Sequence, residues 1–445
     1  MTAKMMKLGG FALLGLGLTV LPALAEEDAP VLSTTDESAY IFNTLLFLMT
    51  GFMVMFMAAG FAMLEAGMVR SKNVAIQCTK NISLFAIAGI MYYLVGYNLM
   101  YMGVDGGFIG TLSLWSPDDT AALAEAADFG AGEGYAAASD WYFQMVFVAT
   151  AASIVSGTLA ERIKLWPFLI FTVILTGFIY PIQGAWQWGG GWLSEMGFSD
   201  FAGSTIVHST GGWAALVGAI VLGARYGKYG PKGEISVMPG SSMPLATLGT
   251  FILWLGWFGF NGGSQLALGS AENAVAISQI FINTNMAAAA GVVAAMVLTQ
   301  LLYSKVDLTM ALNGALAGLV SITAEPLTPT LGSAALIGAV GGVIVVIAVP
   351  MLDKLKIDDV VGAIPVHLFC GIWGTMAVPL TNGDTSFYVQ AVGVVSIGAF
   401  VVIASLAFWL ALKFTIGIRA SQDDEVIGLD KAEIGLEAYP EFARG

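Results

Sequence analysis

The chain has 445 residues, of which 57% are hydrophobic and only 11% are charged, and its mean hydropathy is +0.80. These values exclude a water-soluble domain of this length and are typical of a protein that crosses a membrane many times. The formal net charge of -14 argues against a nucleic-acid partner. The two cysteines, Cys78 and Cys370, have no spacing that indicates a disulfide framework or a zinc site.

The first 25 residues are typical of a signal peptide. A positively charged start and a short apolar core precede the motif ALA at 23–25, after which the chain becomes acidic. We expect cleavage there, a membrane domain over 26–417 and a polar cytoplasmic tail over 418–445.

Apolar segments recur along the mature chain and predict eleven transmembrane helices in an all-α polytopic membrane protein. The predicted spans lie at roughly 40–64, 84–103, 141–160, 165–185, 203–224, 243–262, 274–303, 308–323, 332–352, 360–380 and 389–416. After the signal peptide, every Lys and Arg residue, Lys80 among them, is assigned to an alternate connecting segment or to the tail. The positive-inside rule then predicts that the N-terminus lies outside and the tail in the cytoplasm. We expect the protein to be embedded in the lipid bilayer of the inner (plasma) membrane.

The only two histidines of the chain lie in two similar apolar segments. DFAGSTIVHSTGG at 200–212 and DVVGAIPVHLFCG at 359–371 share an aspartate, a glycine, a valine, the histidine and a final glycine at the same offsets. These segments open the fifth and the tenth predicted spans, so their helices cross the membrane in opposite directions. This arrangement predicts two inverted five-helix repeats plus a final helix, with a site where the repeats meet.

Each histidine follows its aspartate by eight residues. If the helices start at Asp200 and Asp359, His208 and His367 lie about 12 Å from opposite ends, near the middle of a hydrocarbon core of about 30 Å. A lone intramembrane histidine more often bonds to a neighbouring helix, but the matched positions favour a functional pair. Helix capping alone accounts for Asp359, whereas Asp200 either only caps its helix or also adds negative charge at the outer mouth.

Two neutral imidazoles offer polarity without fixed charge, which suits a small neutral solute or a proton relay. At the outer ends of the predicted spans the sequence places Phe147, Trp188, Phe260 and Ser264. Aromatic faces attract cations, although an aromatic belt at the membrane surface uses the same residue types.

These motifs resemble the ammonium transporter (Amt/MEP/Rh) family, on its Amt branch. The resemblance covers essentially the whole mature chain, and its markers are AGFAMLEAGMVRSKN, GTLAERIK, DFAGSTIVH, GWFGFNGGS and GAIPVHLFCGIWG. It implies an eleven-helix homotrimer with one pore per subunit. It also implies a pair of pore histidines, which match His208 and His367.

The resemblance implies roles for the outer residues as well. Phe147, Trp188 and Ser264 match the outer ammonium site, and Phe147 with Phe260 matches the stacked phenyl gate below it. Asp200 matches an aspartate linked to substrate binding and deprotonation. The implied function is recruitment of ammonium or methylammonium, deprotonation and passage of ammonia along the histidines.

The tail segment GLDKAEIGLEAY resembles the region through which the family contacts a PII-type signal protein. Ser204 and Ile434 depart from the family pattern, which has glycine and frequently histidine at these positions. The alternative function is an ammonium sensor that signals through this tail. A passive channel for another neutral solute is disfavoured by the outer aromatic and serine residues.

An enzyme is not indicated, because the sequence shows no nucleophile motif, metal cluster or cofactor-binding loop. We therefore expect no catalytic residues, no metal and no cofactor.

Overall fold

A computed structural model describes residues 36–120, 123 and 134–442 of the chain. The predicted signal peptide at 1–25 lies outside the described residues. Within the described residues the secondary structure is helical, apart from two isolated bridges between single residues.

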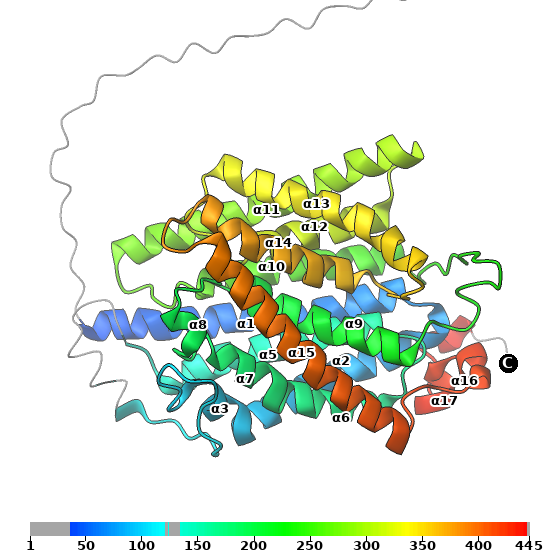
Figure 1. Cartoon of the computed structure of the whole chain (residues 1–445), viewed down its shortest axis with the longest axis horizontal. Coiled ribbons are helices and arrows are strands. Elements are labelled where there is room, and N and C mark those ends of the chain that lie inside the picture. The colour runs from blue at the N-terminus through cyan, green and yellow to red at the C-terminus, as the bar shows by residue number, and fades with distance from the viewer. Residues whose placement is uncertain (1–35, 121–122, 124–133, 443–445) are drawn as a thin grey trace, which may run out of the picture. The chain divides into compact units, whose positions relative to one another are not determined.

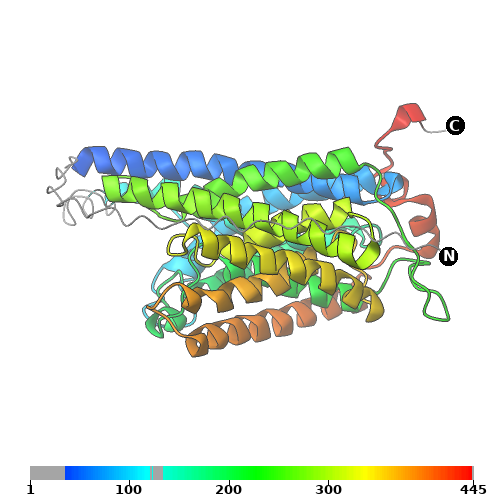
Figure 2. The same cartoon turned by 90° about the horizontal axis from the view of Figure 1, so that it is seen from above.

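The long helices lie side by side in a bundle, with α1 along one side and α15 along the other (Figures 1 and 2). The helices are α1 (Asp36–Met68), α2 (Val74–Met91), α3 (Tyr97–Tyr101), α5 (Ala137–Thr158), α6 (Leu165–Ile174), α7 (Tyr180–Ala185), α8 (Trp192–Glu195), α9 (Thr210–Leu222), α10 (Met243–Gly263), α11 (Ala271–Tyr303), α12 (Leu308–Ile322), α13 (Leu331–Lys354), α14 (Cys370–Ala377), α15 (Phe387–Thr415), α16 (Gln422–Ile427) and α17 (Leu429–Ile434). Short π-helical stretches, η2 (Tyr92–Gly96) and η3 (Leu175–Ile179), join α2 to α3 and α6 to α7.

Among the described residues, eight helical stretches are long and apolar enough to cross a membrane. Each of them overlaps one of the predicted spans. The other three predicted spans fall on α5 and on two shorter apolar stretches, Leu308–Ile322 and Ile364–Leu380. The chain is therefore a multi-pass helical protein, and the count of eleven spans stays a prediction.

The start of the second predicted span and the loop position of Lys80 were wrong. The helical stretch already begins at Ser71, and Lys80 lies inside α2 with no exposed surface. Its Nζ donates to the Ser156 carbonyl oxygen at 2.8 Å and to Gln77 Oε1 at 3.2 Å. Because partners inside the protein satisfy this ammonium group, a locally polar sequence forms part of a membrane helix.

Glycines let α1 and α10 lie in close contact. Gly60 of α1 faces Leu253 and Gly249 of α10, and Gly249 in turn faces Leu64 of α1. A methyl group at Gly249 would collide with the backbone of α1. Small residues at such crossings replace the hydrophobic driving force that lipid does not provide.

Two further helices start inside the bundle, each just after a glycine with a left-handed backbone. Gly203 has φ of 104° and Gly362 has φ of 81°, values that favour glycine. The helices open with six-residue π-helical stretches that carry the histidines, η4 (Ser204–Ser209) before α9 and η5 (Ile364–Phe369) before α14. The chain is not helical from the aspartates to these glycines, so the helical geometry behind the predicted depth of the histidines was wrong.

The two histidine-bearing helices run antiparallel to each other. The Thr205 and Thr375 hydroxyls lie 2.6 Å apart near the start of one helix and the end of the other. Gly212, further along the first helix, faces Leu368, which comes earlier in the second. Opposite directions of this kind are what an inverted repeat requires.

Candidate functional site

The two histidines meet in the interior of the bundle. His208 Nδ1 and His367 Nδ1 are 3.2 Å apart, a hydrogen-bond distance, and the ring centroids are 5.2 Å apart. The exposed fractions are 0% for His208 and 2% for His367. One ring must donate its Nδ1–H and the other must accept it, so the two neutral imidazoles hold opposite tautomers.

Aromatic rings enclose this pair. The Trp257 ring stacks on His208 with centroids 4.9 Å apart, and Phe260 lies 5.2 Å from the same imidazole. Phe61 of α1 lies 6.2 Å from His367. His208 Nε2 is buried and has no hydrogen-bond partner among the described residues. It is therefore a buried polar atom that remains available for a hydrogen bond.

Phe147 and Phe260 stack directly on each other, with ring centroids 3.9 Å apart and an angle of 24° between the planes. Phe260 therefore contacts both Phe147 and His208, which sets the phenyl stack beside the histidine pair. Both phenyl rings are buried.

Trp188 and Ser264 lie nearer the surface than the phenyl stack, because both are partly exposed. The Trp188 ring meets Phe147 edge-on at 6.1 Å, and its indole N–H donates to the Asp200 carbonyl oxygen at 3.0 Å. The Ser264 hydroxyl donates to the Phe260 carbonyl oxygen at 2.8 Å, which leaves the oxygen lone pairs of Ser264 able to accept. We call this side of the bundle the aromatic end.

Asp200 caps the start of the His208 helix. Its carboxylate accepts the backbone N–H groups of Ser204, Thr205 and Ile206 at 2.8–2.9 Å. Burial raises the pKa of Asp200 to about 6, and these backbone hydrogen bonds oppose the rise. At neutral pH the carboxylate is therefore ionised. Its hydrogen bonds go to the start of the helix, and its charge makes the whole aromatic end more negative.

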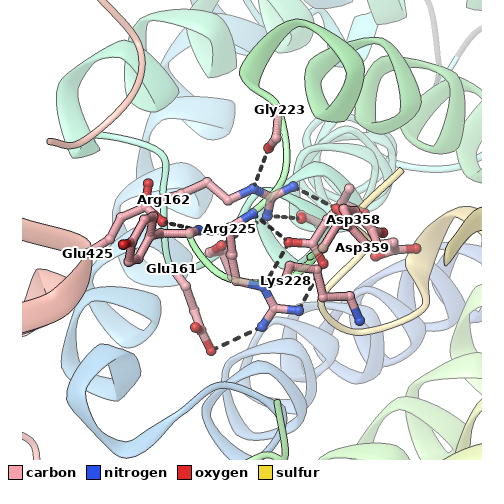
Figure 3. Close-up of polar contacts among 12 residues, drawn as sticks. Glu161, Arg162, Gly223, Arg225, Lys228, Asp358, Asp359 and Glu425 are labelled. Carbon is pink, nitrogen blue, oxygen red and sulfur yellow. Dashed lines mark hydrogen bonds and ion pairs between the residues drawn. The ribbon is translucent and has the colours of Figure 1, made fainter. Parts of the chain in front are cut away.

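The opposite side of the bundle carries a cluster of buried charges, shown in Figure 3. We call this side the basic end. Asp359 caps the His367 helix here, because it accepts the backbone N–H groups of Gly362 at 3.2 Å and Ile364 at 2.7 Å, and the Thr158 hydroxyl at 3.1 Å. Burial raises the pKa of Asp359, against the hydrogen bond from Ile364.

Arg225 holds the neighbouring residue, Asp358, in a bidentate ion pair. Its Nε and Nη2 lie 2.8 and 2.9 Å from the two Asp358 carboxylate oxygens, and its Nη1 lies 3.4 Å from Glu161 (Figure 3). Arg162 donates to the Asp358 carbonyl oxygen at 2.6 Å. Burial alone would raise the pKa of Asp358, but the hydrogen bonds from Arg225 and the charges of both arginines hold it well below its usual range.

The C-terminal segment docks on this same end. Glu425 of α16 accepts the Tyr226 backbone N–H at 2.8 Å and forms an ion pair with Arg419 at 2.5 Å. Asp430 of α17 accepts the backbone N–H groups of Ala75 and Ile76 at 3.0 and 2.8 Å, so it caps the start of α2. The tail is therefore attached to the helices by hydrogen bonds to their ends.

Among the described residues, no group of three or more His, Cys, Asp or Glu side chains is placed to hold a metal ion. The arrangement instead offers two polar ring nitrogens inside an aromatic enclosure and a charged cluster at one end.

Comparisons with known proteins agree with a transport protein. The model of the Ammonium Transporter Family matches residues 45–439. Ammonium transporter Amt2 of Archaeoglobus fulgidus is 42% identical over 427 residues, which cover 89% of this chain and 87% of that protein. The solved structure named Sensor Amt Protein aligns with a TM-score of 0.83 at 35% identity and covers 89% of this chain and 99% of its own. Candida albicans Mep2 aligns with a TM-score of 0.75 at 25% identity, over 92% of both chains.

The fold and the comparisons define a multi-pass membrane transport protein. The chain belongs to the ammonium transporter family.

Three residues near the histidines were not expected from the sequence. The Trp257 ring lies on His208, with ring centroids 4.9 Å apart. Phe61 and Glu65 share one face of α1, and both line a small cavity with His367. The signal available in the sequence was a glutamate inside an apolar segment, which is rare enough to indicate a role.

Replacing Asp358 by Asn should destabilise the protein by about 3–5 kcal/mol, because it breaks a buried ion pair and leaves the Arg225 charge uncompensated. Unfolding of the detergent-solubilised protein measures this as a lower Tm. Since the pKa of Asp358 is lower in the folded protein than in the unfolded chain, the pair stabilises the fold above the ordinary carboxyl pKa of about 4 and loses that contribution as the pH falls further. The Tm difference should therefore stay constant above about pH 5 and shrink below about pH 4.

The matched control is Glu437→Gln, which removes the partner of the partly exposed Lys431. Such a surface pair contributes at most about 1 kcal/mol. Equal effects of the two substitutions would contradict a stabilising role for the buried ion pair between Asp358 and Arg225.

Proposed function

We propose that this protein transports ammonium or methylammonium by binding the cation at the aromatic end, removing a proton and passing ammonia along the two histidines. The observation that carries the proposal is the 3.2 Å contact between His208 Nδ1 and His367 Nδ1 inside a chain of the ammonium transporter family. Its similar relatives are named as ammonium transporters, and this supports ammonium as the substrate.

Binding at the aromatic end relies on Trp188, Phe147 and Ser264. The two rings present aromatic surface to a cation, and the Ser264 oxygen accepts one of its hydrogen bonds. The nearby ionised Asp200 makes the region more negative without needing direct contact with the cation. An ammonium ion therefore exchanges part of its hydration shell for these groups.

The phenyl gate is the stack of Phe147 on Phe260. At 3.9 Å between centroids the rings leave no room for a hydrated ion, so they must rotate apart for each passage. A cation that enters this apolar space without its water shell faces a high desolvation cost, whereas neutral ammonia does not. Loss of the proton near the gate therefore favours passage of the resulting ammonia.

The histidines then supply hydrogen bonds to ammonia without adding charge. Because they hold opposite tautomers, one free Nε2 accepts and the other Nε2–H donates. Potassium is similar in size to ammonium but has no proton to lose, so this chemistry rejects it.

We further propose eleven membrane spans, in two inverted five-helix repeats plus α15, and a basic end that faces the cytoplasm of the inner (plasma) membrane. The arginine-rich connections at that end support this orientation. Residues 1–25 act as a signal peptide in this proposal. Assembly into a homotrimer is part of this proposal and rests on membership of the family. The docked tail, with its exposed acidic residues, is the candidate contact for a PII-type protein.

Removing both imidazoles, in His208→Ala with His367→Ala, should lower ammonium flux through reconstituted protein at least about tenfold, because dehydrated ammonia loses its hydrogen-bond partners. Planar-membrane current and methylammonium uptake measure the effect. The control is Trp373→Phe, since Trp373 also lies on α14 but its indole donates to Ile337 of α13.

In the unaltered protein, ammonium should give flux and potassium should give none. Absence of both current and uptake with ammonium would contradict the transport proposal. Continued exclusion of potassium by the double variant would show that the histidines are not the sole filter.

Replacing Trp188 by Leu should raise the KM for ammonium about 2- to 30-fold with little change in maximal flux, because a cation–aromatic contact contributes about 0.5–2 kcal/mol. Initial uptake rates over a range of ammonium concentrations separate the two parameters. Trp254→Leu on α10 serves as the control, because Trp254 packs on Phe251 and not on the gate. An unchanged KM in the Trp188 variant would remove Trp188 from the binding site.

A second candidate function is an ammonium sensor that signals through the tail. It is favoured by the similarity to the structure named Sensor Amt Protein and by the docking of α16 and α17 on the helix ends. Deletion of residues 420–445 separates the two functions. If the cellular nitrogen response disappears while uptake persists, the tail signals; if the response persists with uptake, the sensor function is contradicted.

A further inference from the structure

Glu65 is a buried carboxylate with one oxygen left free. It lies on α1 with 1% of its surface exposed, and its Oε2 accepts hydrogen bonds from Gln77 Nε2 at 2.7 Å and from the Ser156 hydroxyl at 2.8 Å. Its Oε1 has no hydrogen-bond partner among the described residues. An ionisable group at such a place in a membrane protein is costly and usually functional, and an unpartnered oxygen adds to the cost.

The nearby Lys80 leaves one oxygen of this carboxylate without a hydrogen bond. Its Nζ donates to the same two residues, Gln77 and Ser156, and lies 4.6 Å from the Phe168 ring centroid. Gln77 and Ser156 thus connect the two charged groups, and none of the ion pairs of the described residues joins Glu65 to Lys80 directly. The ammonium charge stabilises a negative charge on Glu65 and leaves Oε1 available.

A small cavity is lined by both Glu65 and His367. It has a volume of about 10 Å³ and is lined by Glu65 and His367 together with Ser153 and Asn313. Measured as the space open to the centre of a water-sized sphere, this volume is enough for one water molecule, and these four side chains supply the polar partners that a water requires. Phe61, one helical turn before Glu65 on the same face of α1, lies 6.2 Å from His367, which agrees with a short separation.

Glu65 lies on the basic-end side of the histidines. It comes three residues before the end of α1 at Met68, which corresponds to about 5 Å along the helix. The free Nε2 of His208 lies on the other side, next to Phe260 and the phenyl stack. The order from the aromatic end to the basic end is therefore His208, His367, the cavity and Glu65.

We propose that Glu65 accepts the proton that ammonium loses, after that proton has passed through both histidines, and releases it at the basic end. This inference rests on the proposed transport of ammonia. An N–H bond of ammonium breaks and the proton binds to His208 Nε2, while the Nδ1–H proton of His208 moves to His367 Nδ1. The Nε2–H proton of His367 then passes through a water molecule in the cavity to Glu65 Oε1.

One ammonia molecule and one proton thus cross the protein, and no electrons are transferred. The two histidines exchange tautomers in each event and must return to the first arrangement before the next one.

The test uses the full-length protein in vesicles of phosphatidylethanolamine and phosphatidylglycerol, with an inward ammonium gradient. Current reports the proton together with its charge, and a pH dye in the lumen reports ammonia that enters alone and takes up a proton there. The unaltered protein should give current with little alkalinisation. Glu65→Gln should lower the current at least about tenfold, since it removes the only acidic proton acceptor on this route, while alkalinisation of the lumen increases. Glu65→Asp should restore part of the current.

Asp140→Asn provides the matched control. Asp140 is also a buried carboxylate in a membrane helix, but it is bound by the Tyr97 hydroxyl and by Gln144 and does not line the cavity. It should behave as the unaltered protein does. Tm and elution volume establish that each variant is folded.

Each other outcome is decisive. Unchanged current in Glu65→Gln overturns the inference, and so does loss of current and alkalinisation together in a folded variant, because Glu65 then shapes the path of ammonia itself. Alkalinisation without current in the unaltered protein overturns the proton route but leaves ammonia transport standing. If the unaltered protein gives neither signal, the proposed function itself fails.

Discussion

Backbone N–H groups at the start of a helix have no partner within that helix, and inside a membrane protein water rarely replaces one. Both histidine-bearing helices begin inside the bundle, so each needs an internal acceptor. Asp200 accepts three such N–H groups at the aromatic end, and Asp359 accepts two at the basic end. Each imidazole lies about one turn beyond its cap. The meeting of the two rings therefore depends on two carboxylates whose own hydrogen bonds are directed at the backbone.

Hydropathy predicted the helices well, because residues that face lipid must be apolar whatever their partners in the fold. One error occurred where a polar side chain is satisfied inside the protein. Lys80 was assigned to a loop because its sequence neighbourhood is polar, and only the fold reveals that Ser156, from a different helix, accepts its hydrogen bond. The pairing of His208 with His367 could be predicted because the repeat carries that information in the sequence itself. The contact of Trp257 with His208 depends on how α10 packs against η4, which no single segment encodes.

At the basic end, two consecutive residues of one loop bind two different parts of the fold. Asp358 binds Arg225 while the next residue, Asp359, caps the His367 helix. Arg225 precedes Tyr226, whose backbone N–H binds Glu425 of the tail. Because these contacts follow one another directly along the chain, the docking site of the tail and the support of a histidine helix belong to one charged cluster (Figure 3). Its arginines provide the directional, bidentate contacts that lysine would not.

The stacked phenyl rings have a consequence for the voltage across the membrane. A membrane holds a voltage only while no continuous aqueous thread connects its two faces, and every resting copy of an open pore would discharge it. In the proposed pore, the stacked rings of Phe147 and Phe260, with centroids 3.9 Å apart, form an apolar barrier to such a thread of water. If the proposed pore runs past these rings, a resting copy of the protein leaves the membrane voltage intact.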